Sequence, residues 1–258
     1  MRTRLILSIF VAALAFPIAT LAQDAGERGQ LGEMVIWRVA PDAAAEFEAA
    51  IAKVTEAAKL ANLGEEHAWH IWQDGFDYGL YGQVENMAEF DDPDAFMRAF
   101  QGTPGEAMLM DAFESFGSLD YEVLSREVIE AVPGWGYTVE QPVEINFAYM
   151  YESWMKPGTE MKADELTKEW VALLKETGYA YEAAGSRVHF GDVGRLVFFI
   201  WYDNQADYYG PNDIGKALEA KGLGAKWGDF ITRWNALITR FEQSTWTYRA
   251  GLSYAPSM

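Results

Sequence analysis

The chain of 258 residues has no cysteine, only three histidines and no long apolar run beyond its N-terminus. Without cysteine there is no disulfide, thiol nucleophile, lipidated cysteine or thiolate metal site. The sequence also lacks GxSxG, which marks a serine nucleophile, and HExxH, which marks a zinc peptidase. Neither GxGxxG nor GxxxxGK[ST] occurs, so nucleotide phosphate binding has no support. These absences leave no motif that names a reaction.

The first 22 residues have the parts of a signal peptide. Two arginines precede a short apolar core at residues 5–18, and small residues end the segment. The core is shorter than the roughly 20 residues that span a membrane. We therefore expect cleavage before Gln23, a flexible N-terminal segment at 23–33, and a periplasmic or secreted protein. A retained membrane anchor is the alternative.

The formal net charge is −19, and acidic residues are spread along the whole chain. Removing residues 1–22 takes away two arginines and no acid, so the charge moves to −21. Nucleic acids and anionic membrane surfaces are polyanions, which makes them unfavourable partners. An even spread of carboxylates is typical of a solvated acidic surface.

The first half of the chain predicts the order strand, helix, strand, strand, helix, strand. Asp42 has the side chain of a helix N-cap, Asn62 begins a stretch that ends the first helix, and glycines at 102 and 105 interrupt the second. The elements are expected at 34–39, 42–61, 67–73, 78–84, 91–116 and 120–129.

Residues 132–144 begin with VPGWG and have the composition of a linker, after which the same order repeats. We expect the elements at 145–155, 159–177, 181–190, 195–202, 214–241 and 245–254. The two halves therefore indicate an internal duplication, with a first unit at 34–131 and a second at 145–255.

The order β-α-β-β-α-β is that of a ferredoxin-like unit, whose helices cover one face of the sheet. Two such units can pack sheet to sheet and form a barrel. In element order, element lengths and aromatic strands, the chain resembles the dimeric α+β barrel superfamily, which includes the antibiotic-biosynthesis monooxygenase-like domains. The resemblance implies an α+β protein with two ferredoxin-like units in an intramolecular pseudo-dimeric barrel, and hence a monomer.

That superfamily includes cofactor-free oxygenases, haem-dependent enzymes, small-molecule isomerases, degradative enzymes and domains without a known activity. The resemblance therefore implies a fold and leaves the activity open.

The stretch HAWHIW holds two of the three histidines, His67 and His70. Side chains alternate between the faces of a strand, so these two cannot hold one metal from a regular strand. We expect His70 to face the barrel interior, where it could act as a general base or a haem ligand. His189 lies on the corresponding strand of the second half. A hydrogen-bonded structural histidine is the alternative for each, and no metal site is predicted.

Aromatic residues make up 15% of the chain, which predicts a bulky core, an aromatic cavity, or both. The candidate ligand-binding residues are Arg38, Tyr81, Tyr149, Glu152 and Trp201. The alternative role of the charged residues among them is a salt bridge, and that of the aromatic residues is core packing.

The leading hypothesis is a periplasmic or secreted protein that binds a small apolar or aromatic ligand between two sheets, without a cofactor. One alternative is a cofactor-free monooxygenase-like enzyme with a histidine or tyrosine base. A second is haem binding through one of the histidines. A third is a structural or interaction protein whose core is filled by its own side chains. The sequence does not decide whether the protein is an enzyme.

Overall fold

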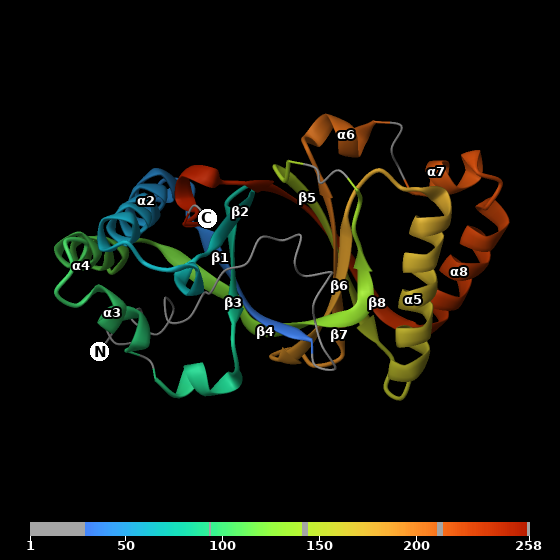
Figure 1. Ribbon diagram of the computed structural model, residues 1–258, viewed down its shortest axis with the longest axis horizontal. Coiled ribbons are helices and arrows are strands. Elements are labelled where there is room, and N and C mark those ends of the chain that lie inside the picture. The colour runs from blue at the N-terminus through green and yellow to red at the C-terminus, as the bar shows by residue number, and fades with distance from the viewer. Residues whose placement is uncertain (1–28, 93, 141–143, 211–213, 257–258) are drawn as a thin grey trace. The chain divides into compact units, whose positions relative to one another are not determined.

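The computed structural model describes residues 29–92, 94–140, 144–210 and 214–256 (Figure 1). The predicted signal peptide lies outside the described residues. The chain divides into two compact units. Of the described residues, unit 1 contains 30–128 and 248–256, and unit 2 contains Gly29 and 129–247.

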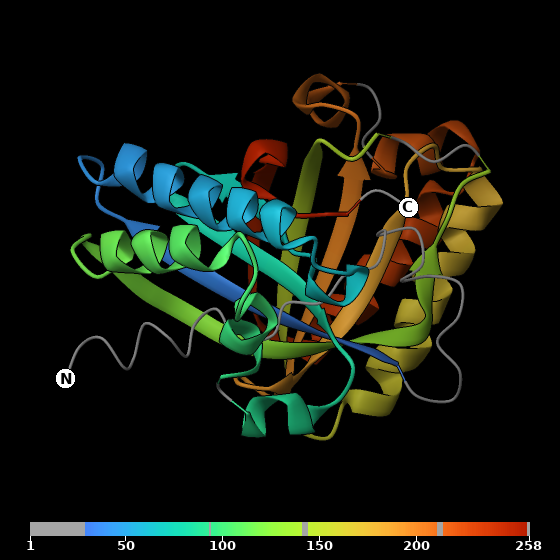
Figure 2. The same cartoon turned by 60° about the vertical axis from the view of Figure 1, so that its left-hand side comes forward.

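Unit 1 has an antiparallel sheet in which β3 pairs with both β1 and β2. Helices α2 and α4 run side by side over one face of this sheet (Figure 2). The elements of this unit are β1 (Gln30–Val39), α2 (Ala44–Ala61), η2 (Glu65–His67), β2 (His70–Asp74), β3 (Asp77–Val84), η3 (Met87–Asp91), α3 (Ala95–Phe100), α4 (Glu106–Phe116), the first part of β4 (Tyr121–Tyr137), and η4 (Ala250–Leu252).

Strand alternation determines which side chains enter the core of unit 1. Trp37 and Ile71 pack with Phe47 of α2 in one buried cluster. His70 and Trp72 alternate with Ile71 and therefore lie on the opposite face of the sheet.

Unit 2 has the same plan. Its strand β5 pairs antiparallel with β7 and β8, and β6 pairs antiparallel with β7. Helices α5 and α8 lie over one face of this sheet (Figure 1). The elements are the second part of β4, β5 (Phe147–Met155), α5 (Glu160–Thr177), β6 (Ala183–Phe190), β7 (Arg195–Tyr202), α6 (Gln205–Tyr209), α7 (Ile214–Ala220), α8 (Gly224–Leu237) and β8 (Ile238–Tyr248).

Along hydrogen-bonded neighbours the strands follow the order β1-β3-β2-β8-β5-β7-β6-β4, which closes as a barrel. The predicted α+β class, with two ferredoxin-like units in one chain, is therefore confirmed.

The unit boundaries differ from those predicted. Strand β4 continues to Tyr137, so it includes the start of the predicted linker 132–144. Strand β8 begins at Ile238, inside the predicted helix 214–241, because pairing with β5 outweighs a helical spacing of apolar residues. Residues 248–256, which were expected to end the second unit, belong to unit 1.

Two local predictions in unit 1 were wrong, and a third extended too far. The cap of α2 is Ala43, without a side-chain hydrogen bond, so Asp42 is not its N-cap. His67 lies in η2 and not in the strand, which begins at His70. Strand β1 begins at Gln30, so part of the segment predicted as flexible is a strand. In contrast, Asn62 ends α2 in the left-handed conformation, as its sequence position predicted.

Candidate functional site

A pocket of about 500 Å³ lies within unit 2, between its sheet and helices α5 and α8. Ten of its sixteen lining residues are aromatic. The aromatic residues are Tyr149, Tyr151, Trp170, Phe198, Tyr202, Tyr208, Trp227, Phe230, Trp234 and Phe241, and the others are Thr167, Ile200, Ile214, Ile231, Asn235 and Gln243.

The floor of the pocket follows from strand register. Tyr151 of β5 pairs with Phe198 of β7, so alternate residues of both strands face the helices together. The rings of Tyr151 and Phe198 stack with centroids 4.8 Å apart and an interplanar angle of 11°. On α8, Trp227, Ile231 and Trp234 recur at intervals of four and three residues, which places them on one helix face over that floor.

The pocket is graded from a buried interior to an exposed mouth. Phe198 and Trp234 are buried, whereas Asn235, Phe241 and Gln243 are exposed. The side-chain amides of Asn235 and Gln243 make no hydrogen bond with any other residue that the structure describes. An aromatic interior with uncharged amides at the mouth is a typical arrangement for binding a small molecule.

The described residues of the lining include no histidine, carboxylate, lysine or arginine. The titratable groups among these residues are tyrosine phenols. Burial, together with the nearby Tyr149 and Tyr202 hydroxyls, raises the pKa of Tyr151 well above its usual value. The phenol therefore stays protonated and can donate a hydrogen bond, but it is poorly suited to act as a general base.

The predicted cavity lay between two sheets, whereas this pocket lies between a sheet and its helices. Of the predicted ligand-binding residues, Tyr149 lines the pocket and stacks on Tyr208 with centroids 5.0 Å apart. Trp201 is buried on the opposite face of the unit 2 sheet, where it stacks on Phe199. Tyr81 belongs to unit 1, where it pairs in register with His70 and its ring lies over Gly32.

The charged candidates have ion-pair partners. Arg38 is exposed and makes two hydrogen bonds of 2.8 Å to Asp77 on the adjacent strand. Glu152 is buried, and Arg195 donates a 2.5 Å hydrogen bond to it. Both observations agree with the salt-bridge alternative for these residues.

The histidines occupy three different environments, and none of them lines the pocket. His70 is 8% exposed, and its Nδ1 lies 3.1 Å from the Tyr248 hydroxyl. Within the described residues its Nε2 is buried without a hydrogen-bond partner. His67 is half-buried beside Glu66, and the half-exposed His189 lies beside Glu130. The predicted catalytic roles remain predictions.

Haem is one cofactor used in the superfamily, and the residues of this pocket do not fit it. The lining residues that the structure describes offer no histidine, cysteine or methionine as an axial ligand, and no cation for the haem propionates. Within the described residues no group of three or more histidine, aspartate or glutamate side chains could hold a metal ion. No helix in this part of the chain is long and apolar enough to cross a membrane.

Most of the pocket residues were not predicted as ligand-binding. Trp227, Ile231 and Trp234 lie at helical spacing within the predicted helix 214–241, but such spacing alone does not distinguish a packed face from a pocket wall. Phe241 was assigned to that helix, whereas it lies on β8 at the mouth of the pocket.

No protein-family model and no curated protein sequence matches the chain. Solved structures do match. A Fusobacterium nucleatum protein assigned provisionally as a monooxygenase aligns with a TM-score of 0.55 at 11% identity, covering 90% of this chain and 100% of that one. An anthrone oxidase-like protein aligns with a TM-score of 0.51 at 13% identity, covering 86% and 92%.

A chlorite dismutase variant from Candidatus Nitrospira defluvii aligns with a TM-score of 0.51 at 12% identity, covering 88% of this chain and 93% of that one. Identities this low support the fold alone. Together with the strand order and the repeated β-α-β-β-α-β units, these structural matches show that this chain has the dimeric α+β barrel fold, with both ferredoxin-like units in one polypeptide.

Proposed function

We propose that the protein binds a small planar aromatic molecule in the pocket of unit 2. The observation that carries the proposal is a space of about 500 Å³ walled by ten aromatic side chains. This volume lies within the range of about 300 to 1,000 Å³ that is usual for small-molecule sites. A pocket filled by its own side chains, as in a purely structural role, would leave no such space.

The chemistry of the walls favours a flat, largely apolar ligand. Ring pairs such as Tyr151 with Phe198 and Trp227 with Phe230 are stacked, so they present flat surfaces to a ligand ring. Each aromatic contact contributes about 0.5 to 1.5 kcal/mol beyond the burial of apolar area. For a two-ring probe we expect a dissociation constant of roughly 0.1 to 1 mM, given typical ligand efficiencies.

Calorimetric titration with 2-naphthol tests the proposal. The variant Ile231→Trp adds bulk to the wall, and we expect it to weaken binding at least tenfold. Thr232→Trp is the matched control, because Thr232 is the next residue of α8, is exposed and does not line the pocket. Equal affinity of the wild type and Ile231→Trp would refute the assignment of this pocket, and so would the absence of any binding.

A second candidate function is a cofactor-free monooxygenase-like activity on the bound molecule. The structural likeness to an anthrone oxidase-like protein supports it, whereas the raised pKa of Tyr151 and the lack of a histidine base among the described lining residues do not. Oxygen uptake with anthrone as the substrate tests it. Binding without oxygen uptake supports a binding protein, and uptake that Ile231→Trp abolishes supports the enzyme.

The proposal includes export from the cytoplasm and a monomeric state. The supporting features are the charge and apolar pattern of residues 1–22 and the presence of both ferredoxin-like units in one chain. The measurements are N-terminal sequencing of the protein from a periplasmic or culture fraction, and light scattering of the purified protein. A mature chain that begins at Met1, or a stable dimer, would contradict these parts of the proposal.

A further inference from the structure

Among the described residues, the lining of the unit 2 pocket contains no charged side chain, although charged residues make up 23% of the whole chain. Gln243 is exposed at the mouth, and in the sheet it pairs with Tyr151, whose side chain lies on the pocket face. Its neighbour Glu242 pairs with Glu152, so strand alternation directs Glu242 to the other face of the sheet. The charged side chains of β8 therefore lie on the face of the sheet that points away from the pocket.

A buried carboxylate needs a cation or several hydrogen-bond donors, because it loses its hydration. The interior offers aromatic faces, whose quadrupoles present negative charge to the ligand. The phenol of Tyr151 lies in this environment, where burial raises its pKa and so disfavours its anionic form. A ligand anion at the same place would experience the same penalty.

The mouth offers a different kind of contact. Asn235 on α8 and Gln243 on β8 are exposed amides that line the pocket. An amide both donates and accepts hydrogen bonds without a net charge, so it can pair with a hydroxyl, a carbonyl or another amide. An aromatic ligand would place its rings inside and its polar substituent at these two side chains.

We propose that the pocket selects uncharged aromatic ligands with one hydrogen-bonding substituent and rejects their anionic analogues. In this proposal the side-chain amides of Gln243 and Asn235 form hydrogen bonds with that substituent. This inference rests on the proposed binding function and deepens it. It concerns the pocket itself, and is separate from the general repulsion of anions by a chain of net charge −19.

The test compares 2-naphthamide with 2-naphthoate at pH 7, a pair of similar shape that differs in charge. We expect calorimetry to give at least tenfold weaker binding of the naphthoate. The ratio should persist in about 0.5 M NaCl, because salt screens the field of distant charges but not desolvation in a pocket. A ratio that disappears in salt would overturn the inference.

The variant Gln243→Lys supplies a cation at the mouth, and we expect it to strengthen naphthoate binding at least fivefold while leaving naphthamide binding within about threefold. Thr232→Lys adds the same charge at an exposed position of α8 outside the lining and serves as the control. Equal gains in the two variants would overturn the role of Gln243.

The outcomes separate the two proposals. If naphthamide and naphthoate bind equally well to the wild type, the charge selection fails and the aromatic-binding function stands. If neither compound nor 2-naphthol binds, the proposed function fails and the inference fails with it.

Discussion

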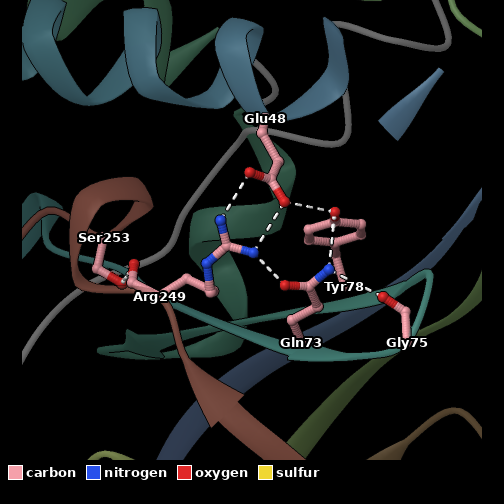
Figure 3. Close-up of polar contacts among 6 residues, drawn as sticks. All are labelled: Glu48, Gln73, Gly75, Tyr78, Arg249 and Ser253. Carbon is pink, nitrogen blue, oxygen red and sulfur yellow. Dashed lines mark hydrogen bonds and ion pairs between the residues drawn. The ribbon is translucent and has the colours of Figure 1, made fainter. Parts of the chain in front are cut away.

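Arg249 makes two hydrogen bonds to the carboxylate of Glu48, at 2.8 and 2.6 Å, although 201 positions separate the two residues (Figure 3). Arg249 also donates to the side-chain oxygen of Gln73, and the Tyr78 hydroxyl donates a 2.7 Å bond to Glu48. The backbone nitrogen of Arg249 donates to the carbonyl of Ile71. These contacts hold the end of the chain on α2, β2 and β3 of unit 1.

The first prediction concerns this network. Arg249→Ala should lower the free energy of unfolding by about 2 kcal/mol, because it leaves a partly buried carboxylate without its charged donor. The side chains of Arg249 and Glu48 are each 28% exposed. Urea unfolding measures the loss, and the double variant with Glu48→Ala should lose less than the sum of the single variants. Arg98→Ala, which removes an exposed ion pair with Asp92, should cost clearly less than Arg249→Ala, because solvent screens an exposed pair. Equal costs would contradict the prediction.

The second prediction concerns the titration of His70. Burial lowers the pKa of His70 to about 4, below its ordinary value of 6.5. The folded state therefore favours the neutral ring, and this contribution is present above pH 6.5 and is lost as the pH falls through 4. With labelled histidines, NMR should show a midpoint near 4 for this residue. A midpoint above 6 would contradict the burial.

The same shift has a consequence for stability. Between pH 6.5 and pH 4 the wild type should lose roughly 3 kcal/mol more than His70→Gln, since each pKa unit is worth about 1.4 kcal/mol. Chemical unfolding at both pH values measures this difference. Parallel pH profiles for the two proteins would show that the imidazole does not titrate as a buried group.

The third prediction concerns the buried pair of Glu152 and Arg195. Burial, with Glu242 nearby, raises the pKa of Glu152 to about 7, and burial lowers the pKa of Arg195 to about 10, at which it remains protonated near neutrality. A raised carboxyl pKa means that its contribution to stability is present below about 4.5 and is lost as the pH rises through 7.

Arg195→Met should therefore destabilise the protein by about 3 to 5 kcal/mol at pH 8, where Glu152 is left as a buried anion, and by less at pH 5, where it can be protonated. Adding Glu152→Leu should restore most of the loss. Thermal unfolding at both pH values is the measurement. A loss that does not depend on pH would indicate that packing, and not charge, dominates at this pair.

The fourth prediction links packing to the pocket. A Cβ atom at Gly185 would lie 2.8 Å from the Phe198 ring and 3.0 Å from Trp135. Gly185→Ala should cost about 1 to 3 kcal/mol and weaken 2-naphthol binding, because Phe198 lines the pocket and must shift. Gly228→Ala is the matched control. Nothing lies near its Cβ on α8, so it should be neutral or stabilising by up to about 1 kcal/mol. Unchanged binding in Gly185→Ala would contradict the link.

The sequence could predict each element whose signal is local. Asn62 and Gly178 end α2 and α5 because an asparagine or a glycine adopts the left-handed conformation most readily. The alternation of apolar residues indicated the strands, and the repeated order indicated two ferredoxin-like units. These signals depend on backbone conformation and on side-chain periodicity, which neighbouring residues determine.

The candidate site was less predictable. Tyr149 was selected from the sequence and lines the pocket, but Trp201 was selected on equal grounds and lies on the opposite face. Aromatic composition shows that large side chains must be buried somewhere. It does not show whether their packing closes completely or leaves a space, because that depends on how α8 lies against the sheet.

By itself the sequence determined the α+β class, the order of elements in two ferredoxin-like units and the helical spacing of Trp227 and Trp234. Only the tertiary structure decided that β4 extends to Tyr137, that Arg249 is bonded to Glu48, and that the cavity lies between a sheet and its helices. The physical reason is that strand pairing and long-range hydrogen bonds join residues that no local pattern connects, and these interactions outweigh local propensity where the two conflict.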